Sequence, residues 1–463
     1  MNVKNHEQSK YHPMWLVKKN TIQTFLSLNK IVFLSIILLL LSFLVGLPVG
    51  YLFFGILFLI GLLKPEFLLV ALFSVGTFKN LDIFQHFPVD LTIFIFGITI
   101  YITLLIVFLK SKINKIKLTG VLVLLQGLLM FFSAGFISGA EDLKWWNVGH
   151  FLVFNLPLFF LPFLIIHYES YKTQIKNIIL GIYSISLMLL GAAFHNFYFG
   201  KLTSWSLTAF GESYITLSLY ISFGIIFLLY CLFYEKSKLS KFFYFILLIF
   251  FIAGLILSPS MGIFFSLIAV LIFLSLKIFI DQRKNFKKNI FLFLLMLIII
   301  IFGFFIFQKA KIMSFGVERI IPTLGRLESS QRIKFFCDAI EDFIKNPLIG
   351  KGVGMFSYEH GGKGTYPHNI FLEVAAEYGL IGIVIFGPFL VYLLYLALKF
   401  VKIIPFNDIF LLIPIWFLII FLDAMVSGSI VDSRSIWFFG AVILIISRNI
   451  KRKESTIKNY KLL

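Results

Sequence analysis

Charged residues are scarce in this sequence, at 14% of the 463 positions, and cysteine occurs only twice. Hydrophobic residues make up 60% of the chain and aromatic residues 18%. So few polar side chains cannot cover the surface of a domain folded in water, which excludes a soluble protein. We therefore expect a polytopic membrane protein.

The apolar runs also lack the in-and-out alternation of barrel strands, so helices must be the spanning elements. Candidate spans lie near 31–47, 49–63, 67–79, 91–109, 118–137, 148–166, 178–199, 214–234, 242–257, 261–280, 290–307, 380–398, 409–422 and 435–447. Some of them are short for a hydrocarbon core. The predicted fold class is all-α, a polytopic transmembrane bundle of about 12 to 14 helices with a long, partly helical extracytoplasmic loop.

Acidic residues are the rarer charge, 22 against 41 Lys and Arg, which gives a formal net charge of +19. The basic residues cluster in alternate connections between spans, as is typical of cytoplasmic loops. The surplus of basic residues therefore indicates the orientation of the protein in the membrane and its attraction to anionic lipid, and not a surface that binds nucleic acid. The polar, basic segment before Lys30 runs into merged apolar spans, which predicts no cleavable signal peptide.

This orientation predicts the division of the chain. We expect a cytoplasmic tail at 1–30, transmembrane helices at 31–307, an extracytoplasmic loop at 308–379, further transmembrane helices at 380–447 and a basic cytoplasmic tail at 448–463. Cys231 would lie near the cytoplasmic side and Cys337 in the outer loop, so the two cannot form a disulfide.

The large loop contains an amphipathic pattern. Its apolar residues at helical spacing are Ile333, Phe336, Ile340, Phe343 and Ile344. Charged residues take the other face, which predicts a helix lying on the membrane surface. Asn346-Pro347 should end this helix, and Gly350, Gly352 and Gly354 allow a sharp turn after it. These glycines do not form a nucleotide P-loop, because no strand precedes them and no Gly-Lys-Ser/Thr sequence closes them.

Arg319, Arg326 and Arg332 precede or open this helix, and His368 closes the loop. A guanidinium can grip phosphate oxygens through two parallel hydrogen bonds and stays charged at any working pH. An imidazole can exchange a proton near neutral pH. The segment therefore favours chemistry on a lipid-linked diphosphate, with a surface lid of no chemical role as the alternative.

Three stretches together carry a resemblance to a known family. They are residues 332–356, Pro367-His368-Asn369-Ile370-Phe371-Leu372-Glu373, and Glu377-Tyr378-Gly379-Leu380-Ile381-Gly382. This region resembles the signature segment of the bacterial O-antigen ligase and polymerase family. In that family an Arg opens an amphipathic helix, an Asn-Pro-Leu-Ile-Gly-x-Gly-x-Gly-like turn follows, and a His-Asn pair precedes a Glu-x-Gly-x-x-Gly entry into the next membrane helix.

The resemblance implies a metal-independent, inverting glycosyltransferase in the bacterial inner membrane, with no cofactor. Its donor would be an undecaprenyl-diphosphate-linked glycan, and the hydroxyl of a second glycan or of a lipid A core would attack the anomeric carbon. His368 would take the proton of that hydroxyl or hydrogen-bond the diphosphate, and Arg332 would contact the diphosphate. The remaining residues expected to bind substrate are Arg319, Arg326, Asn369, Glu377 and Lys201.

The sequence departs from this family at one position. Family members often carry a Ser-Arg-Gly-like triplet where a membrane helix begins on the outer side, whereas the matching stretch here is Ser258-Pro259-Ser260-Met261-Gly262. Met261 stands where an arginine is expected. Either the long loop and Lys201 hold the diphosphate, or the chain belongs to a polymerase branch with another arrangement, or its activity is reduced.

Other functions remain to be weighed. An O-antigen ligase and a surface-polysaccharide polymerase share their donor and differ in the acceptor, and the motif slightly favours the ligase. A lipid-linked oligosaccharide flippase or transporter should show two similar halves, and the sequence shows no such duplication. A non-catalytic scaffold would not need clustered arginines and a histidine.

Overall fold

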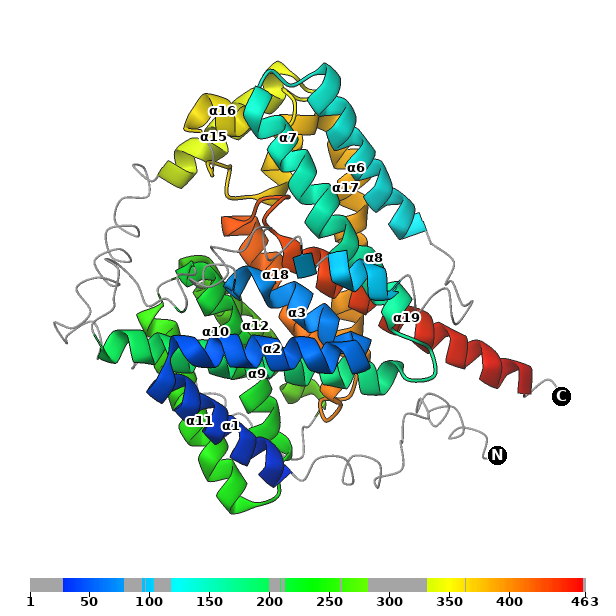
Figure 1. The fold of residues 1–463 in the computed structure, drawn as a ribbon. Coiled ribbons are helices and arrows are strands. Elements are labelled where there is room, and N and C mark those ends of the chain that lie inside the picture. The colour runs from blue at the N-terminus through cyan, green and yellow to red at the C-terminus, as the bar shows by residue number, and fades with distance from the viewer. Residues whose placement is uncertain are drawn as a thin grey trace.

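The structure is a computed structural model, and it describes residues 28–78, 94–95, 97–103, 118–199, 209, 213–258, 260–281, 331–362 and 364–460. Every regular element in these ranges is a helix (Figure 1). In chain order they are α1 (Leu28–Val45), α2 (Leu47–Leu63), α3 (Pro65–Phe78), α6 (Leu118–Phe136), α7 (Glu141–His150), η1 (Phe151–Asn155), α8 (Leu156–Ile165), α9 (Tyr171–Tyr198), α10 (Tyr214–Tyr234), α11 (Lys238–Leu257), α12 (Met261–Asp281), α15 (Gln331–Lys345), α16 (Met355–His360), α17 (Ile370–Ile403), η5 (Ile409–Leu411), α18 (Leu412–Ser427) and α19 (Arg434–Tyr460).

Seven helical segments of the described chain are long and apolar enough to cross a membrane: Thr119–Phe136, Glu141–Ile165, Tyr171–Tyr198, Tyr214–Tyr234, Lys238–Leu257, Ile370–Ile403 and Ile409–Ser427. Four shorter apolar helices accompany them, namely Lys30–Val45, Pro48–Leu63, Pro65–Thr77 and Gly262–Lys277. The chain is thus a multi-pass membrane protein, and the predicted all-helical fold class is confirmed. The span predicted near 290–307 lies outside the described residues, as does part of the one near 91–109.

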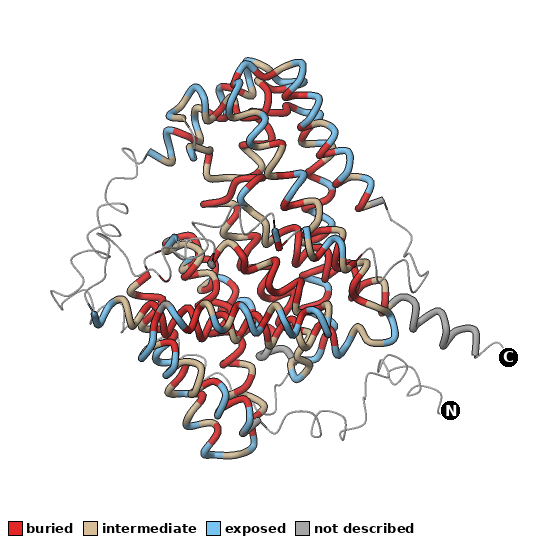
Figure 2. The backbone as a smooth tube through the Cα atoms, in the orientation of Figure 1, coloured by how far each residue is buried: buried red, intermediate tan, exposed pale blue. Residues whose placement is uncertain are grey.

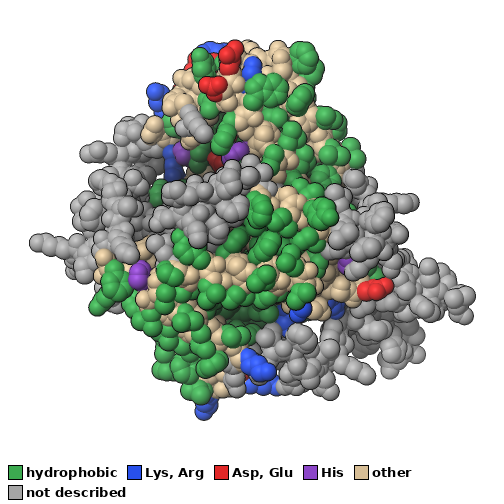
Figure 3. Space-filling model, in the orientation of Figure 1, with side chains coloured by type: hydrophobic (Ala, Val, Ile, Leu, Met, Phe, Trp, Pro, Cys, Tyr) green, Lys and Arg blue, Asp and Glu red, His purple; other side chains and the backbone are tan. Residues whose placement is uncertain are grey.

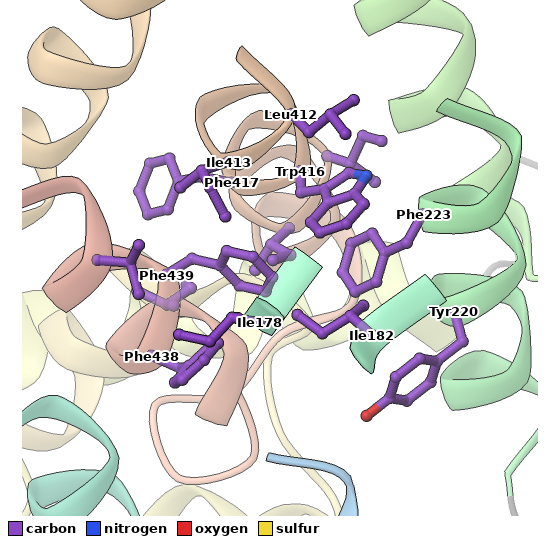
Figure 4. Close-up of a cluster of buried hydrophobic side chains, with 14 of the residues drawn as sticks. Ile178, Ile182, Tyr220, Phe223, Leu412, Ile413, Trp416, Phe417, Phe438 and Phe439 are labelled. Atoms are coloured by element: carbon purple, nitrogen blue, oxygen red, sulfur yellow. The ribbon is translucent and has the colours of Figure 1, made fainter. Parts of the chain in front are cut away.

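Buried aromatic side chains fill the centre of the bundle. Phe223 of α10 packs against Trp416 of α18 with ring centroids 5.1 Å apart, and Phe439 of α19 lies 5.6 Å from Phe223 (Figure 4). Buried residues gather where these helices meet, while exposed ones follow the outward faces (Figure 2). Since lipid tails are as apolar as the helices, close van der Waals packing of this kind holds a membrane bundle together.

One end of the bundle carries basic connections. There, Lys277 Nζ of α12 donates a hydrogen bond to the carbonyl of Lys402 at 3.3 Å, and the Tyr230 hydroxyl of α10 donates to the carbonyl of Asn407 at 3.1 Å. Lys172, at the start of α9, lines the same region as Asp408. Lysines that are far apart in the sequence therefore share one end, as the alternating charge pattern predicts.

The opposite end, here named the loop end, contains α15, α16 and the start of α17. Asn369 Nδ2 donates to the carbonyl of Met425 at 3.0 Å, which joins the start of α17 to the end of α18. The Ser218 hydroxyl at the start of α10 donates to the carbonyl of Ser258 at 2.6 Å. Figure 3 shows Lys, Arg, Asp and Glu side chains gathered at the top of the molecule, where Figure 1 places α15 and α16.

The helix α17 begins at Ile370, well before the span predicted near 380–398. Asn369 ends the loop because its side-chain oxygen accepts hydrogen bonds from the backbone N–H groups of Phe371 and Leu372, at 2.9 and 3.0 Å. Such a cap satisfies donors that have no partner within the helix. The His-Asn pair therefore starts the helix directly.

A kink divides α17 at Gly379, whose φ is +60° and ψ −155°. The loop after α15 fills the break: the N–H of Leu380 donates to the carbonyl of Pro347 at 2.8 Å, and the N–H of Lys351 donates to the carbonyl of Ala376 at 2.9 Å. A Cβ on Gly379 would lie 2.5 Å from the backbone of Leu348. Glycine is needed here both for its positive φ and for this close approach.

The amphipathic helix is present as α15 and ends directly before Asn346-Pro347, as predicted. The helix packs on α17 through the face that contains the buried Phe335 and Ala339. Ile340 and Ile344, on the face expected to lie on the membrane surface, are 47% and 68% exposed, and the contact of that face with lipid stays a prediction.

Candidate functional site at the loop end

His368 lies directly before α17 in an unusual backbone conformation. Its φ of +59° is left-handed, which histidine tolerates better than most residues that are not glycine. The imidazole ring packs beside Tyr366, with ring centroids 4.4 Å apart, and faces Phe335 of α15 at 6.2 Å. The buried Pro367 and the Asn369 cap fix the chain on either side, so the imidazole is held in place.

Arg332, in the first turn of α15, lies at the same place. Its guanidinium makes a long hydrogen bond of 3.5 Å to the carbonyl of Val426, just beyond Asp423 in α18. Burial, with the nearby positive charge of Arg332, lowers the pKa of His368 to about 4. The structure thus brings Arg332 and His368 together, although thirty-odd residues separate them in the sequence.

The imidazole is neutral at physiological pH under these conditions, and a neutral imidazole can accept a proton. Its Nδ1 atom is buried without a hydrogen-bond partner among the described residues. Nδ1 is therefore closed to solvent, and a ligand of the imidazole would have to meet Nε2.

Two buried glutamates lie one turn apart below the imidazole in α17. Glu373 accepts a hydrogen bond from the N–H of Ile430 at 2.7 Å, and Glu377 accepts one from the N–H of Gly354 at 2.9 Å. Both carboxylates thus bind the protein's own backbone and connect the loop to the turn that follows α18. Asn369 caps α17 and also donates a hydrogen bond to the carbonyl of Met425. Asn369 and Glu377 therefore bind the protein itself, and these contacts position the segments around His368.

Asp423 is a site residue to which the sequence gave little weight. Its Oδ1 atom is buried without a hydrogen-bond partner among the described residues, and a Cβ added to Gly262 would lie 2.4 Å from it. Asp423 therefore faces the start of α12 at Gly262. The only sequence signal was an acidic residue close to the end of an apolar span.

Tyr366 was likewise missed, because a tyrosine in a polar loop carries no motif. Burial raises the pKa of its hydroxyl to about 12, and the carboxylates of Asp432, Glu373 and Asp423 add to the rise while Arg332 opposes it. This hydroxyl therefore lies where four segments of the loop end meet.

The glycine-rich turn does not offer its backbone to a phosphate. The N–H of Val353 donates to the Ser133 hydroxyl at 3.0 Å, and the N–H groups of Lys351, Gly352 and Gly354 also bind protein oxygens. Because a phosphate cradle needs free N–H groups, the structure agrees with the rejection of a P-loop.

A second charged cluster joins α15 to α16. Asp342, Glu359 and His360 lie close enough to hold a metal ion, but Lys351 Nζ lies among them, 2.6 Å from Asp342 and in contact with Glu359. His360 Nε2 is 3.1 Å from Asp342. Lys351 already supplies a positive charge to these carboxylates, so the cluster links α15 to α16 through ion pairs.

Arg319, Arg326 and Lys201 lie outside the described residues, and so does the side chain of Met261. The candidate site therefore consists of Arg332, Tyr366, His368, Glu373 and Asp423, arranged where α12, α15, α17 and α18 meet at the loop end.

These features define a multi-pass helical membrane protein with a polar, histidine-containing site at one end of the bundle. Residues 245–387 match the model of a protein family described as O-antigen ligase. The matched segment contains the start of α12, Arg332, the glycine-rich turn, His368 and the kink at Gly379, so the resemblance to the O-antigen ligase family is confirmed. The curated proteins contain no match to the chain.

Proposed function

We propose that the protein is a membrane glycosyltransferase that moves a glycan from an undecaprenyl-diphosphate carrier to the hydroxyl of an acceptor sugar. The observation that carries the proposal is the convergence of Arg332 and a neutral His368 at the loop end. The family match over residues 245–387 supports a ligase or polymerase type of membrane enzyme.

The proposed reaction is a single displacement. The acceptor hydroxyl transfers its proton to Nε2 of His368 as its oxygen forms a bond to the anomeric carbon of the donor. The bond from that carbon to the diphosphate oxygen breaks, and the diphosphate leaves with the electron pair. Attack from the face opposite the leaving group inverts the anomeric centre, and the imidazolium then returns its proton to solvent.

Arg332 is assigned to the leaving group. Charge grows on the diphosphate as the bond breaks, and a guanidinium placed there stabilises the transition state more than the ground state. This arrangement requires neither a metal nor a cofactor. Arg319, Arg326 and Lys201 remain proposed as further diphosphate contacts.

The loop end is assigned to the extracytoplasmic side of the bacterial inner membrane. The described lysines at the opposite end fit the cytoplasmic side, where basic connections are retained. Lipid-linked glycans would then approach through the outer leaflet.

The test is a transfer assay with purified protein in liposomes and a labelled undecaprenyl-diphosphate-linked repeat. Given a lipid A core, an O-antigen ligase forms a new glycosidic bond to that core. Given the donor alone, a polymerase extends it. We expect the first product. Extension of the donor alone would select the polymerase instead, and movement of the lipid across the bilayer without any new bond would overturn the proposal in favour of a flippase.

A further inference from the structure

The Tyr366 side chain stands in the site without a role in the displacement described above. Its backbone is anchored, because the carbonyl of the preceding Thr365 accepts a hydrogen bond from the Ser357 hydroxyl at 2.5 Å and Pro367 is buried. Its ring lies 4.4 Å from the His368 ring at an angle of 56°. The Tyr366 ring therefore has a fixed position beside the imidazole.

The Tyr366 hydroxyl remains protonated at any working pH. Burial and the carboxylates of Asp432, Glu373 and Asp423 raise its pKa to about 12, while the charge of Arg332 lowers it in part. A neutral phenol can donate one hydrogen bond and accept others. Beside the ring, His368 is partly exposed, and because its Nδ1 atom is buried, a ligand of the imidazole would have to meet Nε2. A hydroxyl donor and a proton acceptor thus lie on adjacent side chains, the pair of groups that a sugar hydroxyl needs.

We propose that Tyr366 positions the acceptor sugar, an inference that rests on the proposed function. Its phenol hydroxyl hydrogen-bonds to the acceptor, and its ring holds the acceptor hydroxyl against His368. The ring also keeps water from the imidazole. Tyr366 would accordingly determine which acceptors react, while Arg332 serves the donor.

The test compares Tyr366→Phe and Tyr366→Leu in the liposome transfer assay, with the donor saturating. Tyr366→Phe removes one neutral hydrogen bond and keeps the ring, so the acceptor KM should rise about five- to tenfold while the donor KM is unchanged. Tyr358→Phe, on the 62% exposed tyrosine of α16, is the matched control and should behave as wild type.

A pH profile gives the second readout. Arg332 and Phe335 from α15 and the Tyr366 ring lie near His368, and Arg332 is the charged group among them. Tyr366→Leu should therefore admit water and move the acid limb of the rate profile to higher pH. Tyr366→Phe should leave that limb in place. A purely structural tyrosine would lower the yield of folded protein without this division between the two variants.

The outcomes separate the two levels of the proposal. If the wild type forms the glycosidic bond and Tyr366→Phe keeps the wild-type acceptor KM, the role of Tyr366 is overturned and the proposed function stands. If the wild type forms no glycosidic bond with any acceptor, both are overturned.

Discussion

At the scale of single residues, the site is dominated by the surroundings of His368. The rings of Phe335 and Tyr366 pack beside the imidazole, and both burial and the nearby guanidinium of Arg332 disfavour the imidazolium form. Apolar neighbours do so by removing water, and Arg332 does so by charge repulsion. The result is an imidazole that remains unprotonated down to acidic pH.

Replacing Arg332 by Gln should therefore raise the pKa of His368 from about 4 toward its ordinary value of 6.5. The pKa rises because a proton added to the imidazole is no longer repelled by a nearby positive charge. NMR of the histidine ring carbons, in a titration from about pH 3 to about pH 8, would measure this change in the pKa. Lys334→Gln, on an exposed residue of the same helix, should leave the titration unchanged, and an equal or lower pKa in the Arg332 variant would contradict the account.

At the scale of elements, α17 is two helical pieces joined at Gly379. The loop from Pro347 to Lys351 binds backbone groups on both sides of the break, so the loop and the kink depend on one another. Glu377, near the end of the first piece, accepts a further hydrogen bond from the N–H of Gly354. The position of His368 at the start of α17 therefore depends on a glycine far from the imidazole.

Gly379→Ala should destabilise the protein by about 2 kcal/mol or more, because a Cβ adds left-handed strain and overlaps the Leu348 backbone. Gly387→Ala is the matched control on the same helix. A Cβ there would meet its nearest neighbour, in Ile383, at 3.8 Å, and alanine favours a helix interior over glycine. Thermal unfolding in detergent should rank the Gly379 variant lowest, and equal stabilities of the two variants would show that the kink does not need glycine.

Sequence patterns predicted some of these elements and missed others for physical reasons. Apolar length predicted the spans, and Asn346-Pro347 predicted the end of α15, because both depend on local chemistry. The start of α17 was predicted too late, since the buried Glu373 and Glu377 interrupt the apolar run and only tertiary hydrogen bonds reveal their burial. Arg332 and His368 followed from the family pattern, whereas Tyr366 and Asp423 join the site only through contacts between distant segments.

At the scale of the whole molecule, the bundle separates a basic end from the loop end, which contains the candidate site. Cys231 is buried in α10, and Cys337 is exposed on α15 at the loop end. They are the only two cysteines of the chain, so the natural sequence contains one accessible thiol among the described residues.

A membrane-impermeant maleimide should therefore label Cys337 in sealed right-side-out vesicles, without any engineered residue. Cys337→Ser should abolish the labelling and serves as the control for reaction at Cys231. Labelling confined to inside-out vesicles would place the loop end in the cytoplasm, away from the proposed supply of lipid-linked glycan.

The most direct measurement of the central claim is the rate of glycan transfer by His368→Ala in liposomes, beside wild type and His167→Ala, a histidine that lies between α8 and α9. Because loss of a general base typically costs about 10²- to 10⁴-fold, the account predicts a fall of that size for His368→Ala and wild-type transfer for His167→Ala. A His368→Ala protein that folds normally and still transfers glycan at the wild-type rate would contradict it.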